Sequence, residues 1–436
     1  MFKINRNNLF IQDLKECTIH IKRTKALKIS VYVILIYIVI TILSFIIIPF
    51  ITPIENTIIS NDFKIFYQSV QTILANPEEL YTLPDYKMPF RYFPLFSLLF
   101  LPYTLIPFEV GFIIHTFLLG IFQIASFYLI YVISTKFYNI RYNTKLKKDL
   151  LFLVLMAPVQ VPMIMMGQIS QIFIFLMLIV IFLIENARLK KYSIKGEYLL
   201  IGIILGLGIS IKPFAILIVP LLAKLFIQRD GKKIKLDHKI LFKLLLGLIF
   251  SHLINFVYVL VYPNMLREFL EINTTAQISN YPSSSITRII SILFNSFSIE
   301  AIIMIILTFI SYGFIYVVYL ITPYEKINYP LYFGMAFLLV IIIFTDSWFL
   351  NFLIWFSIVF PGLFQYEDEI NLISSETLKK KLKISNYITY KITYYGIVYF
   401  TVGIVIGFTI FPTDPILPFL LIILYFNLLW RLFRNR

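Results

Sequence analysis

The chain has 436 residues, of which 59% are hydrophobic, 17% aromatic and only 14% charged. A soluble domain carries about a quarter charged residues, so this composition excludes an ordinary soluble protein and predicts one embedded in a lipid bilayer. The net charge of +15 fits cytoplasmic loops rich in lysine and arginine better than a nucleic-acid-binding surface. We therefore expect the bilayer, and not nucleic acid, as a partner.

Cysteine and histidine usage limits the cofactors that the chain could hold. The single cysteine, Cys17, excludes an intrachain disulfide. The four histidines lack the spacing of metal ligands. Nucleotide-binding glycine loops and the common hydrolase motifs are also absent from the sequence. We expect no metal and no other cofactor.

The first apolar run, residues 29–51, follows a basic segment, residues 1–28. The run is too long for the apolar core of a signal peptide and lacks a small-residue cleavage site. It predicts a retained first span that leaves a cytoplasmic tail, residues 1–28, and runs outward. The next stretch, residues 52–92, is slightly acidic, as suits an external loop.

Residues 93–106 decide the topology of the chain. They are apolar, but Pro94 and Pro107 bound a run that is shorter than the ~20 residues of a spanning helix. If they crossed the membrane, the next span, 108–134, would place a cluster of lysines on the outside. Charge and length both favour an interfacial or re-entrant helix at 93–106, so the external loop extends over 52–107.

Lysine and arginine clusters between the later apolar runs orient the rest of the chain. Further spans are predicted at 149–166, 168–185, 198–212, 213–227, 240–262, 298–322, 328–345, 349–365, 392–411 and 416–433. This predicts an all-α polytopic protein of the cell membrane with about twelve transmembrane helices and both termini in the cytoplasm. The expected parts are the tail 1–28, a membrane module 29–365, and a basic loop with a C-terminal helix pair, 366–436.

Polar residues at the outer ends of the spans are candidates for function. Asp62 could cap the helix that begins there or act as a base, and the sequence leaves both open. Arg91 and Tyr92 could anchor the chain at the interface or bind an anionic phosphate.

Three later residues add a cation, Lys212, and two amides, Gln168 and Gln171, on the side of the membrane predicted for Asp62. Lys212 precedes Pro213 within apolar sequence, where a lysine is costly unless it is paired, so a phosphate ligand is favoured over a snorkelling side chain. Gln168 and Gln171 follow Gly167 at an outer turn, where the next span begins. A simple polar turn explains the glycine, and sugar hydroxyls are the alternative partners of the glutamines.

The order of these motifs resembles the polyprenol-phosphate-dependent glycosyltransferases of the C superfamily, and family 87 among them. The resemblance covers roughly residues 30–360 and rests on several short motifs. These are Ser60-Asn-Asp62 with Tyr67, Leu80-Tyr81, Phe90-Arg-Tyr92-Phe-Pro94, Gly167-Gln168, Ile211-Lys212-Pro213, and Ser285 near Arg288. The chain departs from the family where a histidine often follows a Ser-Trp pair, because Phe349 follows Trp348.

The resemblance implies a membrane enzyme that uses a polyprenyl-phosphate sugar, usually of mannose, and a lipid-linked or glycan acceptor on the extracytoplasmic face. It implies Asp62 as the base, and Lys212, Arg91 and Arg288 as ligands of the donor phosphate. The other candidate substrate ligands are Tyr67, Tyr92, Gln168, Gln171, Ser285 and Trp348.

Asp62 is the single candidate carboxylate. One carboxylate is enough for direct displacement by an acceptor hydroxyl, and direct displacement inverts the configuration at the anomeric carbon. A lipid-linked sugar transporter is one alternative, although transporters tend to show internal repeats and polar sites at the bilayer midplane. A polymerase or ligase of surface glycans is the other.

Overall fold

The structure, a computed structural model, divides into two compact units. Unit 1 comprises Met1–Leu129, Asn143–Pro213 and Lys239–Asn273, and unit 2 comprises Ile130–Tyr142, Phe214–His238 and Thr274–Arg436. Each is considered on its own. The residues described are 6–53, 59–82, 90–142, 160–230, 233–274, 285–293, 300–344, 351–363, 365, 376–406 and 416–434.

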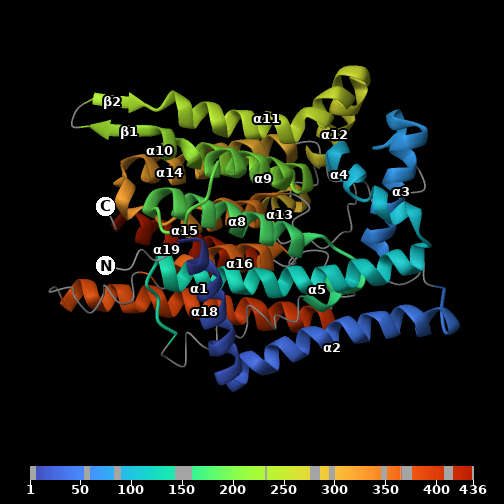
Figure 1. The fold of residues 1–436 in the computed structure, drawn as a ribbon, viewed down its shortest axis with the longest axis horizontal. Helices are drawn as coiled ribbons and strands as arrows, with labels where there is room; N and C mark the ends of the chain where they lie inside the picture. The colour runs from blue at the N-terminus through green and yellow to red at the C-terminus, as the bar shows by residue number, and fades with distance from the viewer. Residues whose placement is uncertain are drawn as a thin grey trace. The chain divides into compact units, whose positions relative to one another are not determined.

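Unit 1 is built from helices (Figure 1). These are α1 (Arg6–Arg23), α2 (Lys25–Ile47), α3 (Asn61–Ala75), α4 (Pro94–Leu99), α5 (Phe108–Val132), α7 (Gln160–Met166), α8 (Ser170–Leu189), α9 (Glu197–Ile211), α11 (His238–Val261) and α12 (Asn264–Thr274). Helices α8 and α9 pack side by side as an antiparallel pair. The start of α8 and the end of α9 therefore lie at the same end of unit 1.

Unit 2 is organised around a helix that is buried along its whole length, α15 (Tyr329–Ile343). It packs against α14 (Glu300–Ile321), α16 (Asn351–Leu363) and α19 (Ile416–Arg434). The other α-helices and the strands described in unit 2 are α10 (Ala223–Phe226), α13 (Ile286–Leu293), α18 (Glu376–Ile406) and the antiparallel strands β1 (Ile227–Asp230) and β2 (Lys233–Leu236). The two strands pair within the basic loop that follows the predicted span 213–227, where the sequence did not predict strands.

Five of the described helices are long and apolar enough to cross a membrane. They are Lys25–Phe50, Phe108–Phe137, Ser170–Leu189, His238–Val261 and Ile302–Ile321. Together with the nearly all-helical chain, they confirm the prediction of an α-helical membrane protein. The count of about twelve spans stays a prediction, and most of the predicted span 149–166 lies outside the described residues.

The interfacial segment predicted at 93–106 consists of short helices. Helix α4 has six residues, and a 3-10 helix, Leu101–Leu105, follows it. The predicted span 213–227 also differs from a regular α-helix, since Pro213–Leu222 is a 3-10 helix with Pro220 inside it. Proline lacks the amide hydrogen that an α-helix uses, which explains the tighter winding here.

Within the region predicted as a tail, residues 6–23 form helix α1 and dock on unit 1. The Tyr192 hydroxyl donates to Asp13, and the hydroxyls of Thr18 and Tyr128 are 3.1 Å apart. The ring of Phe10 packs edge-on against Tyr192. These contacts hold α1 against the α8–α9 connection and α5.

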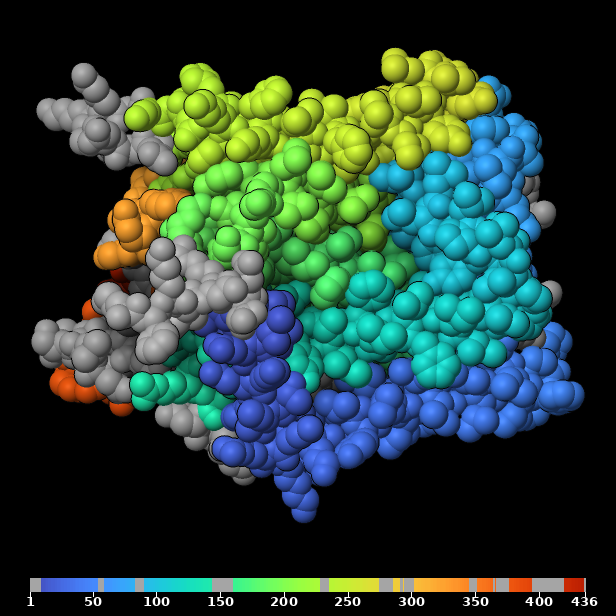
Figure 2. All heavy atoms as spheres, in the orientation of Figure 1, coloured from blue at the N-terminus to red at the C-terminus, as the bar shows by residue number. Residues whose placement is uncertain are grey.

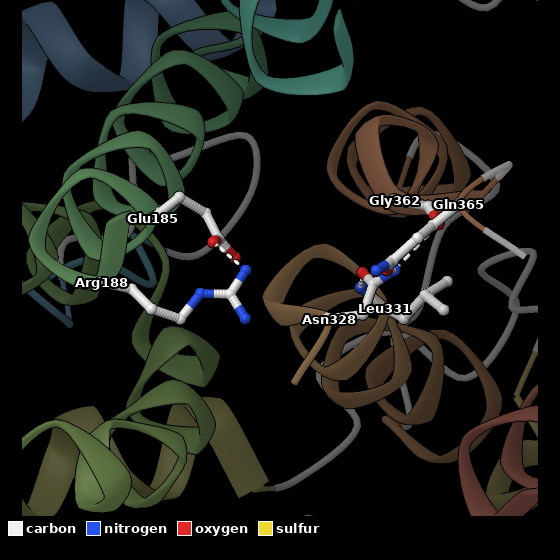
Figure 3. Close-up of polar contacts among 6 residues, drawn as sticks. All are labelled: Glu185, Arg188, Asn328, Leu331, Gly362 and Gln365. Carbon is white, nitrogen blue, oxygen red and sulfur yellow. Dashed lines mark hydrogen bonds and ion pairs between the residues drawn. The ribbon is translucent and has the colours of Figure 1, made fainter. Parts of the chain in front are cut away.

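Two buried polar joints stabilise the units internally (Figure 3). In unit 1 the Arg188 guanidinium donates to Glu185, which is fully buried at the end of α8. In unit 2 the Asn328 side chain accepts from Leu331 N at 3.1 Å and donates to Gly362 O at 2.9 Å and to Gln365 Oε1 at 2.7 Å. Asn328 therefore caps α15 and ties it to the end of α16.

Helices α9 and α11 approach each other through small residues. Gly202 and Gly206 recur every four residues on α9, and Gly247 and Ser251 do so on α11. A Cβ built on Gly202 would collide with the Leu244 carbonyl, and one built on Gly247 with the Leu199 carbonyl. Small residues at this spacing let the backbones of two membrane helices come into contact.

Gly202→Ala is expected to destabilise unit 1. The added methyl group meets backbone that cannot move aside, and overpacking of this kind costs about 1–3 kcal/mol. Gly313→Ala is the control, because nothing lies within 4 Å of a Cβ there and alanine favours the helix. The Tm of the detergent-solubilised protein should fall for Gly202→Ala and not for Gly313→Ala. Equal Tm values in the two variants would contradict the close packing.

Candidate active site

Asp62 lies in the first turn of α3 and is buried, with 7% of its surface exposed. The residue at the helix N-cap is Ser60, which has a left-handed backbone (φ 60°). Its amide donates to the Met165 carbonyl at 2.8 Å, so the start of α3 is bonded to the segment before Gly167. Capping therefore does not account for Asp62, although a carboxylate in a first turn is favoured by the helix dipole.

The turn between α7 and α8 supplies the hydrogen-bond partner of Asp62. Gln168 Nε2 donates to Asp62 Oδ2 at 2.6 Å, while Gln168 Oε1 accepts from Ile169 N at 2.9 Å. The second bond sets the orientation of the amide, so its nitrogen faces the carboxylate. Gly167 makes the turn possible, with φ at +72° and a Cβ position only 2.7 Å from Phe63 Cβ.

His115 on α5 supports this turn from behind. Its Nε2 lies 3.0 Å from the Gly167 carbonyl oxygen, which can only accept, so Nε2 donates. Nδ1 then accepts from the Tyr103 hydroxyl at 3.2 Å. His115 has no signature in the sequence, because the four histidines lack the spacing of metal ligands and its partners are brought to it by the fold.

Lys212 and Tyr92 lie together at the same end of unit 1. Lys212 Nζ is 5.6 Å from the centroid of the Tyr92 ring, a cation–π geometry. The Tyr92 carbonyl accepts a hydrogen bond from the Tyr81 hydroxyl at 2.9 Å. The ring of Tyr92 packs against Phe66 and Phe96. Gln168 interacts with the Tyr92 side chain, which joins this pair to Asp62.

The charges of these residues act on one another. Burial raises the pKa of Asp62 to about 6, and the positive charge of Lys212 opposes that rise. Burial and the Asp62 charge raise the pKa of Tyr92 well above its usual range, so Tyr92 is a neutral hydroxyl. Arg91 is half-buried beside them, and its charge acts on both Tyr92 and Lys212. Asp62 thus titrates in the range useful to a general base at neutral pH.

The other candidate residues of unit 1 differ in their surroundings. Tyr67 is half-buried, with its ring against Phe63 and Phe108. Gln171 is fully buried in the first turn of α8. Neither its amide nitrogen nor its amide oxygen has a hydrogen-bond partner in the described part of the chain.

Two candidates belong to unit 2, and one lies outside the described residues. Ser285 Oγ accepts from Arg288 N at 3.1 Å at the start of α13, so it caps that helix. Both side chains are fully buried. Trp348 is among the residues that the structure does not describe. Across the described ranges, no group of three or more His, Cys, Asp or Glu side chains could hold a metal ion.

Long apolar helices and a buried, hydrogen-bonded carboxylate beside a lysine define a membrane protein with the side chains for acid–base chemistry. The sequence profile of glycosyltransferase family 87 matches residues 90–351, more than half of the chain. The chain belongs to this family. It is therefore a membrane glycosyltransferase, an enzyme that requires a sugar donor and an acceptor.

The matched range includes Arg91, Tyr92, Gln168 and Lys212 and begins after Asp62. A comparison with curated proteins found no match.

Gly167→Ala is expected to displace Phe63 and, with it, the start of α3. Gly196→Ala is the matched control, because Gly196 has the same left-handed backbone (φ +71°) but nothing within 4 Å of a Cβ. Both variants incur the strain of a left-handed alanine, about 1–2 kcal/mol. Only Gly167→Ala adds a collision, so its Tm should fall further. A larger loss in Gly196→Ala would contradict the close contact.

Proposed function

We propose that this enzyme transfers a hexose from a polyprenyl-phosphate donor to a hydroxyl of a lipid-linked or glycan acceptor, with inversion and with Asp62 as the base. The observation that supports this most is the hydrogen bond from Gln168 to the buried Asp62 carboxylate, with Lys212 close enough to lower its pKa. A base and a cation for a leaving phosphate are the two groups that such a displacement requires.

In the proposed reaction, the acceptor hydroxyl oxygen attacks the anomeric carbon of the donor sugar. Its proton passes to an Asp62 carboxylate oxygen. The bond between the anomeric carbon and the phosphate oxygen breaks, and its electron pair stays on that oxygen. The donor leaves as polyprenyl phosphate with one more negative charge. Gln168 holds the carboxylate in one orientation throughout, because its own oxygen is bonded to Ile169 N.

Lys212 is the proposed ligand of the leaving phosphate. A cation placed where negative charge develops lowers the barrier more than one that acts only on the bound substrate. Arg91, next to Tyr92, is the proposed second phosphate ligand. We assign Arg288 of unit 2 a supporting role towards the same phosphate, on the basis of the family resemblance.

Gln171 is the proposed ligand of sugar hydroxyls. A buried amide whose donor and acceptor are both unpaired costs about 1–3 kcal/mol per group. A hydroxyl of the substrate, which donates and accepts, would satisfy both. Tyr67, Tyr92, Gln168, Ser285 and Trp348 complete the proposed substrate ligands, and mannose is the proposed sugar.

The proposed transfer takes place on the extracytoplasmic face of the membrane. At one end of the α8–α9 pair lie Gln168 and Lys212, and at the other end lie Arg188, Lys190 and Lys195. Basic residues favour the cytoplasmic side of a membrane. The same rule supports about twelve spans, both termini in the cytoplasm of a multi-pass cell-membrane protein, and the division into the tail 1–28, the module 29–365 and the C-terminal part 366–436.

Asp62→Asn is expected to lower transfer by at least about 100-fold, since an amide cannot take the acceptor proton. Transfer is measured in membranes with radiolabelled polyprenyl-phosphate-mannose. Glu79→Gln is the matched control, because Glu79 is an exposed carboxylate just beyond α3 and should retain full activity. Unchanged transfer in Asp62→Asn would remove Asp62 as the base.

Transfer by the wild type should fall below a pH of about 6, as the Asp62 carboxylate becomes protonated. The carboxylate must be ionised to act as a base, so activity is lost on the acid side. In Lys212→Met the acid limb should move to higher pH, because the charge that lowers the Asp62 pKa is gone. Residual activity with an unmoved limb would contradict this coupling.

A further inference from the structure

Helix α11 contributes a buried polar residue, Asn255, to the end of unit 1 at which Lys212 and Tyr92 lie. Most of the helix is apolar and exposed at the molecular surface (Figure 2), and only Leu244, Gly247, Ser251 and Asn255 are buried. Asn255 is the last of this stripe. It is 3% exposed, and a primary amide so deeply buried needs partners for its oxygen and its nitrogen.

Asn255 has these partners on two other elements. Its Oδ1 accepts from Leu95 N of α4 at 2.7 Å. Its Nδ2 donates to Ser210 Oγ of α9 at 3.0 Å and to His252 Nδ1 at 2.8 Å. One side chain therefore joins α4, α9 and α11.

Both bonded segments lead directly to candidate site residues. Leu95 follows Tyr92 by three residues, and Ser210 precedes Lys212 by two. The segments are also bonded to each other, since Phe93 N donates to the Ser210 carbonyl at 3.2 Å. Asn255 thus closes a ring of hydrogen bonds between the two segments that carry Tyr92 and Lys212.

The packing of α9 on α11 makes this joint stiff. Below Ser210, Gly206 and Gly202 face Ser251 and Gly247 without room for a methyl group. Asn255 continues the same four-residue spacing on α11 as Ser210 does on α9. The close approach of the two backbones brings the amide within hydrogen-bond distance of the serine hydroxyl.

We propose that Asn255 is a positioning residue for the transfer reaction, which holds Lys212 and Tyr92 in place relative to each other and to Asp62. The inference deepens the proposed function and rests on it for the reaction, while the positioning itself can be measured without a substrate. The Asn255 amide acts through the Leu95 and Ser210 segments to which it is bonded.

Loss of the Asn255 bonds should free Lys212 and weaken its effect on Asp62. Among the residues that the structure describes, the ionisable groups around Asp62 are Lys212 and Tyr92, with Arg91 beside them and His115 behind the Gly167 turn. Lys64, on the same helix, is exposed. Of these, Lys212 is the cation that opposes the raised pKa of Asp62, so its displacement should move the acid limb of transfer to higher pH.

The experiment compares purified full-length Asn255→Ala with Ser251→Ala. Ser251 is one turn earlier on the same stripe, and its hydroxyl donates to Leu248 O of its own helix. Ser210→Ala is a milder second variant that removes the Nδ2 partner from the other side, in case Asn255→Ala does not fold. The first readout is the rate of Lys212 acetylation by limiting acetic anhydride, measured by mass spectrometry with Lys64 as the internal reference.

Acetylation of Lys212 should rise several-fold in Asn255→Ala and less in Ser210→Ala, and stay at the wild-type rate in Ser251→Ala. The second readout is the pH profile of transfer, whose acid limb should move up by about half a pH unit or more in Asn255→Ala. A fall in Tm with unchanged Lys212 labelling and an unmoved limb would overturn the proposal, because Asn255 would then only stabilise the fold.

The labelling also separates this inference from the proposed function. Faster Lys212 acetylation in Asn255→Ala supports the positioning role even if the wild type does not transfer from polyprenyl-phosphate-mannose, an outcome that would overturn the proposed donor alone. If the wild type transfers normally and Lys212 labelling is unchanged in both Asn255→Ala and Ser210→Ala, the proposed donor stands and the positioning role is overturned.

Discussion

The arrangement of unit 1 around its candidate site depends on the bond between Gln168 Nε2 and Asp62 Oδ2. A buried carboxylate is costly unless donors and positive charge compensate it. Here the donor comes from a turn that only a left-handed Gly167 allows, and the positive charge comes from the end of α9. Three elements must therefore meet at one place for Asp62 to be both buried and ionised near neutral pH. A carboxylate with these properties serves proton transfer better than it serves stability.

Much of this could be predicted from the sequence, because polar residues in apolar surroundings are conspicuous. Asp62, Gln168 and Lys212 are each conspicuous for that reason. The bond between Asp62 and Gln168 is not, since the sequence suggests a turn or sugar hydroxyls for the glutamine. Their common side of the membrane stays a prediction from charge. The apolar runs predict the five described helices that are long and apolar enough to cross a membrane, and Pro94 and Pro107 predict the short helices of the 93–106 segment. These are local signals, which need no knowledge of what lies across the fold.

The residues that the sequence did not reveal act through contacts between distant segments. His115 bonds a carbonyl 52 residues away, and Asn255 bonds an amide 160 residues away. A lone asparagine in an apolar span has no local signature that tells a joint from a surface residue. The same holds for α1 and for the β1–β2 hairpin, whose basic residues signal the side of the membrane and not the secondary structure.

The bond between Asp62 and Gln168 also has a consequence for synthesis, since it joins residues 106 positions apart. At a translation rate of about 5–20 residues per second, the ribosome needs roughly 5–20 s to reach Gln168 after Asp62. Lys212 emerges later still. Throughout that interval α3 has neither partner, and its amphipathic sequence can keep the carboxylate in water at the bilayer surface. The site is thus completed only after helices α8 and α9 have both been synthesised.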